Sequence, residues 1–132
     1  MTSAEARWRE VAMAGHTHDV ATATEALIDP DPEVRQLALG ALHRMGTLSI
    51  AQLAAGAADE HPGVRRRAAM LLASYPDGPV LPLLHDAEPT VVEAAAWAVG
   101  ERVPAVIDDE LEALIRLAPK APDALAREAA VA

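Results

Sequence analysis

An internal repeat constrains the fold of this chain more than any other feature of its sequence. Three eight-residue segments align without gaps, at 31–38, 61–68 and 88–95, and each has proline second, valine fourth and alanine last. A looser copy, with one extra residue before its arginine, spans 122–130. The register alanines lie 30, 27 and 35 residues apart, at Ala38, Ala68, Ala95 and Ala130. Periods of this length are typical of solenoids built from helical hairpins.

The composition favours helices in every part of the chain. Nearly a quarter of the 132 residues are alanine, the best helix former, and phenylalanine is absent. We find no runs in which β-branched or aromatic residues alternate with polar ones, as strands would require. Each repeat copy offers a proline for the first helical position, and Asp31 is a good N-cap, whereas His61 and Glu88 are poorer ones. The sequence therefore predicts an all-α fold.

Helical periodicity divides each repeat into two helices. Counted at about 100° per residue, the apolar side chains of the first copy fall on one arc, as do those of the third. The predicted core arcs are Val34, Leu37, Ala38, Ala41, Leu42 and Met45, and Val91, Ala94, Ala95, Ala98 and Val99. Partner helices are predicted at roughly 19–28, 48–58, 79–85 and 105–117. Ahead of them, a capping box at 2–5 opens a helix through about residue 14, with Trp8, Val11 and Ala12 on one side.

We interpret residues 1–132 as a single domain. It comprises an N-terminal capping helix at 1–15, repeats at 19–46, 47–75 and 79–102, and a last, incomplete repeat at 104–132. A solenoid end without a polar capping helix exposes apolar surface. The chain is then either a fragment of a longer array, or this end pairs with another molecule. Self-association there would use Leu125, Ala129 and Ala130.

The Asp-Pro-x-Val-Arg-x-x-Ala columns resemble HEAT repeats, particularly the short bacterial HEAT-like type related to phycobilisome lyase subunits. The resemblance covers residues 19–132. It implies a right-handed superhelix of about four helical hairpins, in which the second helix of each pair lines a concave surface. It also implies that an arginine column hydrogen-bonds acidic or backbone groups of adjacent turns. This column is Arg35, Arg65 and Arg127, and Val92 interrupts it.

Charge and cysteine content argue against several functional classes. With 20 acidic against 11 basic residues, the net charge of -9 works against binding to nucleic-acid phosphates. The absence of cysteine excludes disulfides and thiolate chemistry. No apolar stretch is long enough for a signal peptide or a membrane span. We therefore expect a cytoplasmic protein that binds neither nucleic acid nor membrane.

The sequence contains no motif that points to catalysis. Nucleophile-elbow, metalloprotease, phosphate-loop and dinucleotide-binding motifs are absent. His16, His18 and Asp19 are too few to predict a metal site, and Asp19 is better explained as a helix cap. We expect no cofactor and no enzymatic activity. Two alternatives stay open: a bilin lyase-like or lyase-associated subunit, and a structural segment of a longer array with no site of its own.

The predicted binding site lies opposite the core arc, on the concave side. Positions one, five and eight residues after the arginine column point outwards there. They include Gly40 and, as candidate binding residues for a protein or peptide, Gln36, His43, Arg66, Met70, Glu93 and Trp97. An exposed tryptophan beside a methionine is typical of a partner anchor, although Trp97 could instead lean onto the next repeat as ordinary packing. The basic cluster 65–67 either binds an anionic ligand or neutralises Asp59, Glu60 and other acids in ion pairs.

Overall fold

In the computed structural model, residues 3–102 and Ala113 are described, and every regular element among them is helical. The predicted all-α fold is thereby confirmed for this part of the chain. The α-helices are joined by short 3-10 helices, which are labelled η. The elements are α1 (Ser3–Thr17), α2 (Val20–Glu25), η1 (Ala26–Ile28), α3 (Pro32–Arg44), α4 (Ile50–Ala57), α5 (Pro62–Leu71), η2 (Leu72–Ser74), η3 (Leu81–His85) and α6 (Pro89–Glu101).

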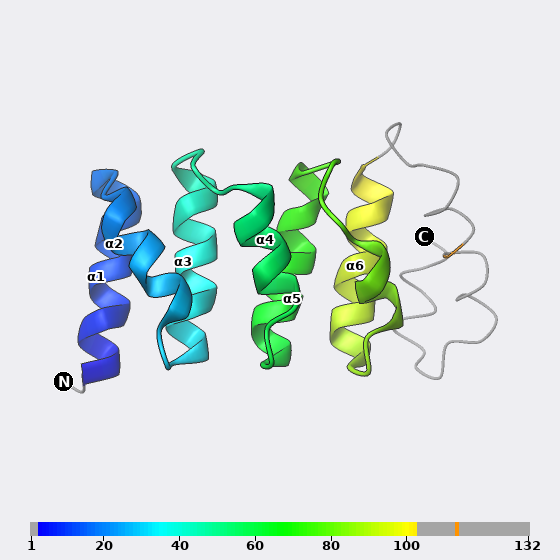
Figure 1. Ribbon diagram of the computed structural model, residues 1–132, viewed down its shortest axis with the longest axis horizontal. Helices are drawn as coiled ribbons and strands as arrows, with labels where there is room; N and C mark the ends of the chain where they lie inside the picture. Colours follow the sequence, from blue (N-terminus) through cyan, green and yellow to red (C-terminus); the bar gives the residue numbers. More distant parts are fainter. Residues whose placement is uncertain (1–2, 103–112, 114–132) are drawn as a thin grey trace.

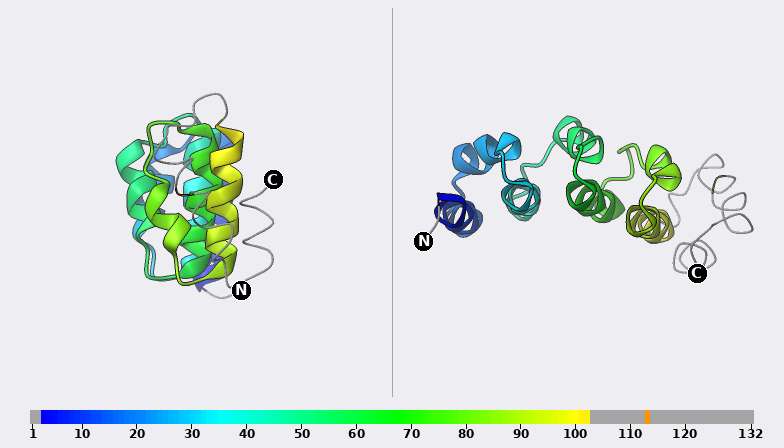
Figure 2. Two further views of the ribbon diagram at one scale, coloured as in Figure 1. Left: turned by 90° about the vertical axis from the view of Figure 1, so that its right-hand side faces the viewer. Right: turned by 90° about the horizontal axis from the view of Figure 1, so that it is seen from below.

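The helices form two layers that run along the length of the molecule (Figures 1 and 2). We call α1, α3, α5 and α6 the inner layer, and α2 with η1, α4 and η3 the outer layer. Consecutive inner helices pack against each other, α1 on α3, α3 on α5 and α5 on α6. Seen edge-on in the right panel of Figure 2, the stack bows gently, with the inner layer on the hollow side. This arrangement confirms the predicted solenoid of helical hairpins.

The helices of the inner layer that belong to the repeats each begin at a proline. Asp31 caps α3, because its carboxylate accepts a hydrogen bond from the Glu33 backbone N–H over 2.9 Å. His61 caps α5 in the same way, since its Nδ1 accepts from the Gly63 N–H over 3.0 Å. A ring nitrogen thus takes the place of a carboxylate oxygen here, so His61 caps its helix, although we expected it to be a poorer cap than Asp31. Glu88 makes no side-chain cap hydrogen bond.

The core lies between the layers and consists of small aliphatic side chains. The predicted arcs of α3 and α6 are buried, apart from Leu37 and Met45, which are partly buried. The register alanines of the described repeats are completely buried, and they are Ala38, Ala68 and Ala95. A methyl group at these positions allows neighbouring helices to approach closely, and a larger side chain would overpack the stack.

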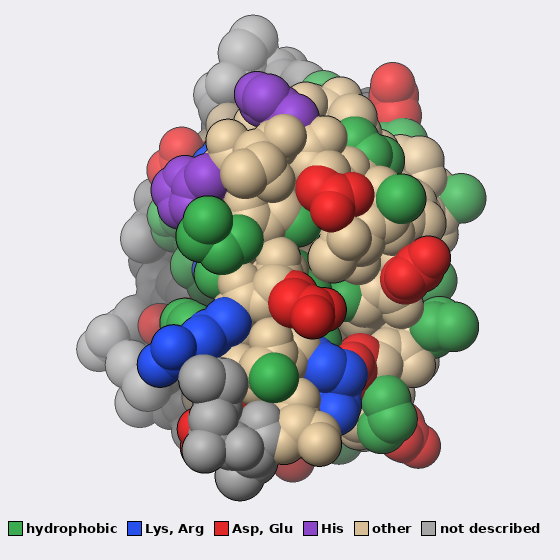
Figure 3. All heavy atoms as spheres, turned by 90° about the vertical axis from the view of Figure 1, so that its left-hand side faces the viewer, with side chains coloured by type: hydrophobic (Ala, Val, Ile, Leu, Met, Phe, Trp, Pro, Cys, Tyr) green, Lys and Arg blue, Asp and Glu red, His purple; other side chains and the backbone are tan. Residues whose placement is uncertain are grey.

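The first helix continues past the residue at which we predicted its end. Gly15, which follows the predicted end, lies inside α1 and is buried. A Cβ there would lie 3.0 Å from Nη1 of Arg44, so the glycine makes room for α3 instead of ending the helix. Figure 3 shows the α1 end of the stack, where hydrophobic side chains are interspersed with acidic, basic and histidine side chains. Such a mixed surface suits a capping helix.

The outer helices are shorter than the inner ones. Residues 20–28 form α2 and η1, close to the predicted 19–28, and α4 lies within the predicted 48–58. The third outer helix, predicted at 79–85, is the five-residue 3-10 helix η3. Pro82 near its start, together with its short length, leaves too few backbone hydrogen bonds for an α-helix. The helix predicted at 105–117, the last repeat with Arg127, and the predicted C-terminal contact lie outside the described residues.

A buried arginine holds the turn between α5 and η3. Arg102, at the C-terminal end of α6, is only 4% exposed. Its Nε donates to the Leu72 carbonyl over 3.0 Å, and its Nη2 donates to the Tyr75 and Gly78 carbonyls, each over 2.7 Å. The side chain therefore adds hydrogen bonds to backbone carbonyls of the segment 72–78, where the Leu72 and Tyr75 carbonyls also accept from the Tyr75 and Gly78 backbone N–H groups.

Candidate binding surface

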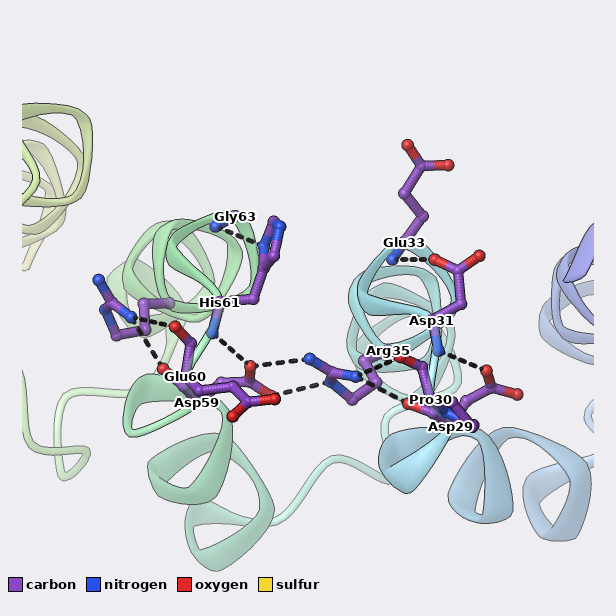
Figure 4. Close-up of polar contacts among 10 residues, drawn as sticks. Asp29, Pro30, Asp31, Glu33, Arg35, Asp59, Glu60, His61 and Gly63 are labelled. Atoms are coloured by element: carbon purple, nitrogen blue, oxygen red, sulfur yellow. Dashed lines mark hydrogen bonds and ion pairs between the residues drawn. The ribbon is translucent and has the colours of Figure 1, made fainter.

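An ion pair that recurs along the stack joins neighbouring repeats. The arginines that take part in it are not available to bind a ligand. On α3, Arg35 donates through Nε and Nη2 to both carboxylate oxygens of Asp59, over 2.9 and 3.0 Å (Figure 4). Its Nη1 donates to the carbonyls of Asp29 and Pro30, over 2.8 and 3.2 Å. Asp59 in turn accepts from the His61 backbone N–H over 2.8 Å. One guanidinium thus connects the turn before its own helix with the turn of the next repeat.

The same arrangement recurs along the stack. Arg65 donates to Asp86 over 2.8 Å and to the backbone carbonyls of residues 59 and 60. Arg7 on α1 pairs with Asp29 over 2.7 Å, so the first helix shares the register of the repeats. The arginine contacts implied by the resemblance are therefore present at Arg35 and Arg65. We call the six side chains the ladder: Arg7, Arg35, Arg65, Asp29, Asp59 and Asp86.

The ladder identifies the ion-pair partners near the basic cluster. One interpretation was that the cluster 65–67 neutralises Asp59, Glu60 and other acids, and Arg65 does form an ion pair, but with Asp86, while Asp59 pairs with Arg35. Each carboxylate lies 21 to 24 residues beyond its arginine, which no local spacing rule connects. A signal was nevertheless present, because an aspartate stands six residues before the arginine column in each described repeat, at Asp29, Asp59 and Asp86.

Hydrogen bonding lowers the pKa of all three ladder carboxylates. For Asp29, the main cause of the lowered pKa is the hydrogen bond from Arg7. Burial alone would raise the pKa of Asp59 and Asp86, but hydrogen bonds from their arginines and from backbone N–H groups outweigh it. Both pKa values therefore lie below the ordinary aspartate value. The ladder is charged and satisfied at neutral pH, and we assign it a structural role.

The predicted binding residues lie on the inner layer, with different degrees of exposure. Trp97 on α6 is 47% exposed, in agreement with the prediction that it points away from the core. Arg66 on α5 is also exposed, whereas Gln36 and Glu93 are half-buried. Met70 is partly buried and packs against the core cluster, so it is less accessible than we expected. Trp97 therefore carries most of the exposed apolar surface of this residue set.

His43 is engaged within the fold. Its Nδ1 lies 2.8 Å from the Tyr75 hydroxyl, and the two rings are tilted at 60° with centroids 5.5 Å apart. Burial raises the pKa of Tyr75, so its hydroxyl is protonated at neutral pH. The contact joins α3 to the turn that Arg102 also holds. We therefore assign His43 to the structure of this turn, although it was predicted as a binding residue.

Gly40 was expected on the surface but is buried. The guanidinium of Arg67 reaches from α5 to α3 and lies over this glycine, where a Cβ would be 2.6 Å from Nη2. The helical register correctly predicted the direction in which position 40 faces. It could not predict that the long side chain of Arg67 covers this position. The Nε of Arg67 is buried and has no hydrogen-bond partner. Within the described residues, Arg67 makes no hydrogen bond or ion pair.

Arg67 forms one side of an open groove of about 340 Å³ that crosses three inner helices. Trp8 forms the opposite side and is 46% exposed, whereas Val11, predicted on the same side of the first helix, is buried. Trp8 occupies the repeat position equivalent to Gln36, because it directly follows Arg7 as Gln36 follows Arg35. The ladder could therefore have identified it as a surface residue of the inner layer. The residues that line the groove are Trp8 from α1, Glu33, Gln36 and Leu37 from α3, and Arg67 from α5.

A second groove, of about 500 Å³, lies between η1 and α4 in the outer layer. Leu39 and Gly56 contribute to its apolar lining, and Ile28 on η1 is 87% exposed. The charged residues of this groove are Arg35 and Asp59, which already satisfy each other. The outer groove therefore offers apolar contact without an unpaired charge.

His16 lies in the last turn of α1, and His18 and Asp19 connect α1 to α2. Asp19 caps α2, since its carboxylate accepts hydrogen bonds from the Thr22 hydroxyl and backbone N–H, and these bonds lower the pKa of Asp19. Among the residues that the structure describes, no three histidine, aspartate or glutamate side chains gather as a metal ion would require. No described helix combines the length and apolar character needed to cross a membrane.

Comparison with known proteins assigns the fold to a family. The family model for HEAT repeats matches residues 50–132, more than half of the chain. No curated protein matches the sequence. The matched region begins at α4 and includes α5 and α6 with their proline, valine and alanine columns. The chain therefore belongs to the HEAT repeat family.

Proposed function

We propose that this chain is a non-enzymatic interaction module that binds a protein or peptide segment along the exposed face of the inner layer. HEAT repeats commonly mediate protein–protein interaction. The observation that carries the proposal is the exposure of both tryptophans of the chain, Trp8 at 46% and Trp97 at 47%, on helices of the inner layer.

Besides the two tryptophans, the exposed large apolar side chains of the described residues are the aliphatic Met13, Val20, Ile28 and Ile50. The core consists of alanine, valine and leucine, and the most deeply buried side chains include Leu42, Leu53 and Leu84. A half-exposed indole offers a large rigid apolar surface, and tryptophan is enriched among the residues that dominate binding energy at interfaces. Trp97 is therefore the residue that we expect to anchor a partner.

Polar side chains on the same layer as the anchor support a specific contact with a protein. Arg66, Gln36 and Glu93 lie at equivalent positions of three successive inner helices and offer both charges and an amide. Such mixed groups select a partner by hydrogen bonding, while the net charge of -9 disfavours nucleic acid.

Affinity capture from a cell lysate tests the proposal. The parent chain is compared with Trp97→Ala, whereas Met70 is left intact because it packs against the core and its truncation would cost stability. Ile28→Ala is the matched control, since it removes an exposed apolar side chain from the outer layer. Circular dichroism verifies that both variants keep the helicity of the parent.

We expect a partner that the parent and Ile28→Ala retain and that Trp97→Ala loses. Equal capture by all three proteins would contradict the inner-layer site. Loss with Ile28→Ala alone would move the site to the outer groove. The absence of any specific capture would favour a structural segment without a site of its own.

A further inference from the structure

We propose that Arg67 receives an acidic side chain of the partner, in the groove between Trp8 and Gln36. The inference rests on the proposed function, because it names the chemistry that one part of the inner layer recognises. The groove spans α1, α3 and α5, so a bound segment would cross the helices of this layer.

The ladder shows how this chain binds a carboxylate and why Arg67 differs. Arg35 and Arg65 each use Nε and Nη2 to hold both oxygens of an aspartate. Arg67, two residues after Arg65 on the same helix, makes no hydrogen bond or ion pair within the described residues. Its Nε is buried and has no hydrogen-bond partner among these residues. A buried donor without an acceptor is rare in folded proteins and calls for a ligand or another explanation.

Gly40 gives the guanidinium its place beside the groove. A Cβ at this position would lie 2.6 Å from Nη2 and 3.5 Å from Cζ of Arg67, so any other residue would displace the guanidinium. Glycine in a helix interior is unfavourable because it increases the entropy lost on folding. Here the missing side chain keeps Arg67 close to α3, where it lines the groove with Gln36 and Glu33.

The lining of the groove favours a carboxylate over a phosphate. Arginine binds both groups through paired hydrogen bonds. This groove, however, is lined by a single guanidinium and by the exposed carboxylate of Glu33, which repels a dianion more strongly than a monoanion. The Gln36 amide adds neutral donors, and the Trp8 ring offers an apolar wall for the methylene groups of an aspartate or glutamate.

Nuclear magnetic resonance of the full chain tests the proposal with defined probes. The ¹⁵N-labelled protein is titrated with N-acetylglutamate N-methylamide, with the neutral glutamine analogue, and with inorganic phosphate. We expect saturable shifts of the Arg67 Nε–Hε and Trp8 indole N–H signals with the glutamate probe. We expect no comparable shifts with the other two compounds.

Three variants assign the effect to Arg67. Arg67→Gln is expected to weaken binding of the glutamate probe about tenfold or more. Gly40→Ala keeps the charge but displaces the guanidinium, and we expect a loss of several-fold with an unchanged helical spectrum. Arg44→Gln is the charge-matched control, because Arg44 is exposed at the opposite end of α3. The affinity of this variant for the glutamate probe should stay within about twofold of the parent value.

Several results would overturn the proposal. They are unshifted Arg67 and Trp8 signals, equal shifts with the glutamine analogue, a response to phosphate but not to the carboxylate, and equal weakening by Arg44→Gln. Each of these results is separate from the Trp97→Ala capture experiment. If the titration shows no binding at Arg67, the proposed interaction module is not affected. If the capture experiment finds no partner, saturable binding of the glutamate probe at Arg67 would still require this site.

Discussion

Replacing Asp59 with asparagine removes the charge from the middle step of the ladder and keeps the shape of the side chain. In the parent, Asp59 accepts two hydrogen bonds from Arg35, over 2.9 and 3.0 Å, and one from the His61 N–H over 2.8 Å. Asparagine can still accept from one donor, but it places an amide N–H₂ where the second oxygen accepted from the guanidinium. The variant therefore breaks the paired contact between two repeats.

The expected cost follows from the burial of the pair. The side chains of Arg35 and Asp59 are 13% and 15% exposed. Exposed ion pairs contribute about 0 to 1 kcal/mol, whereas breaking a buried pair costs about 3–5 kcal/mol. Because Arg35 keeps its bonds to the carbonyls of Asp29 and Pro30, we expect the free energy of unfolding to fall by about 2 kcal/mol. For a domain of this length, that corresponds to a fall in Tm of about 8 °C.

Urea unfolding followed by circular dichroism measures this loss. A double-mutant cycle with Arg35→Met isolates the coupling between the two side chains, which we expect to be about 1–2 kcal/mol. A coupling below about 0.3 kcal/mol would refute the reasoning, because the ion pair would then not stabilise the contact between the two repeats.

Three further predictions concern acid, the core and the buried turn. The ladder carboxylates have folded pKa values below those of the unfolded chain, so their contribution to stability is present at neutral pH and is lost as the pH falls below about 4. Urea unfolding across this range should show a smaller acid loss for Asp59→Asn than for the parent, and equal losses would contradict the linkage. Ala68→Leu overpacks a completely buried position and should cost about 2 kcal/mol, so an unchanged urea midpoint would refute the close approach of the helices. Arg102→Met removes three hydrogen bonds from a charged donor to the carbonyls of Leu72, Tyr75 and Gly78 and should cost about 3 kcal/mol, with faster proteolysis within 72–78; a parental cleavage rate would argue against its role.

The inner helices and their buried faces could be predicted because both depend on local sequence. A proline marks the start of α3, α5 and α6, and the spacing of Val34, Ala38 and Leu42 gives the arc that α3 buries. These signals need no knowledge of a neighbouring helix. They were sufficient to predict the solenoid and the exposure of Trp97.

The remaining parts of the surface depend on contacts between helices, which periodicity does not describe. The direction of Gly40 was predicted correctly, but Arg67 covers it from the next helix. His43 likewise points outwards from its own helix, yet Tyr75 approaches it from a turn 32 residues away. Long side chains reach across several ångströms, so their endpoints follow from the packing of helices and not from the register of one helix.

The most direct test of the interaction module is the affinity of a captured, purified partner for the parent, Trp97→Ala and Ile28→Ala, measured by isothermal titration calorimetry. We predict that Trp97→Ala weakens binding about thirtyfold, as truncation of a central interface tryptophan does, while Ile28→Ala changes the Kd less than about twofold. Unchanged affinity of Trp97→Ala would contradict the account, and a larger loss with Ile28→Ala would also place the partner on the outer layer.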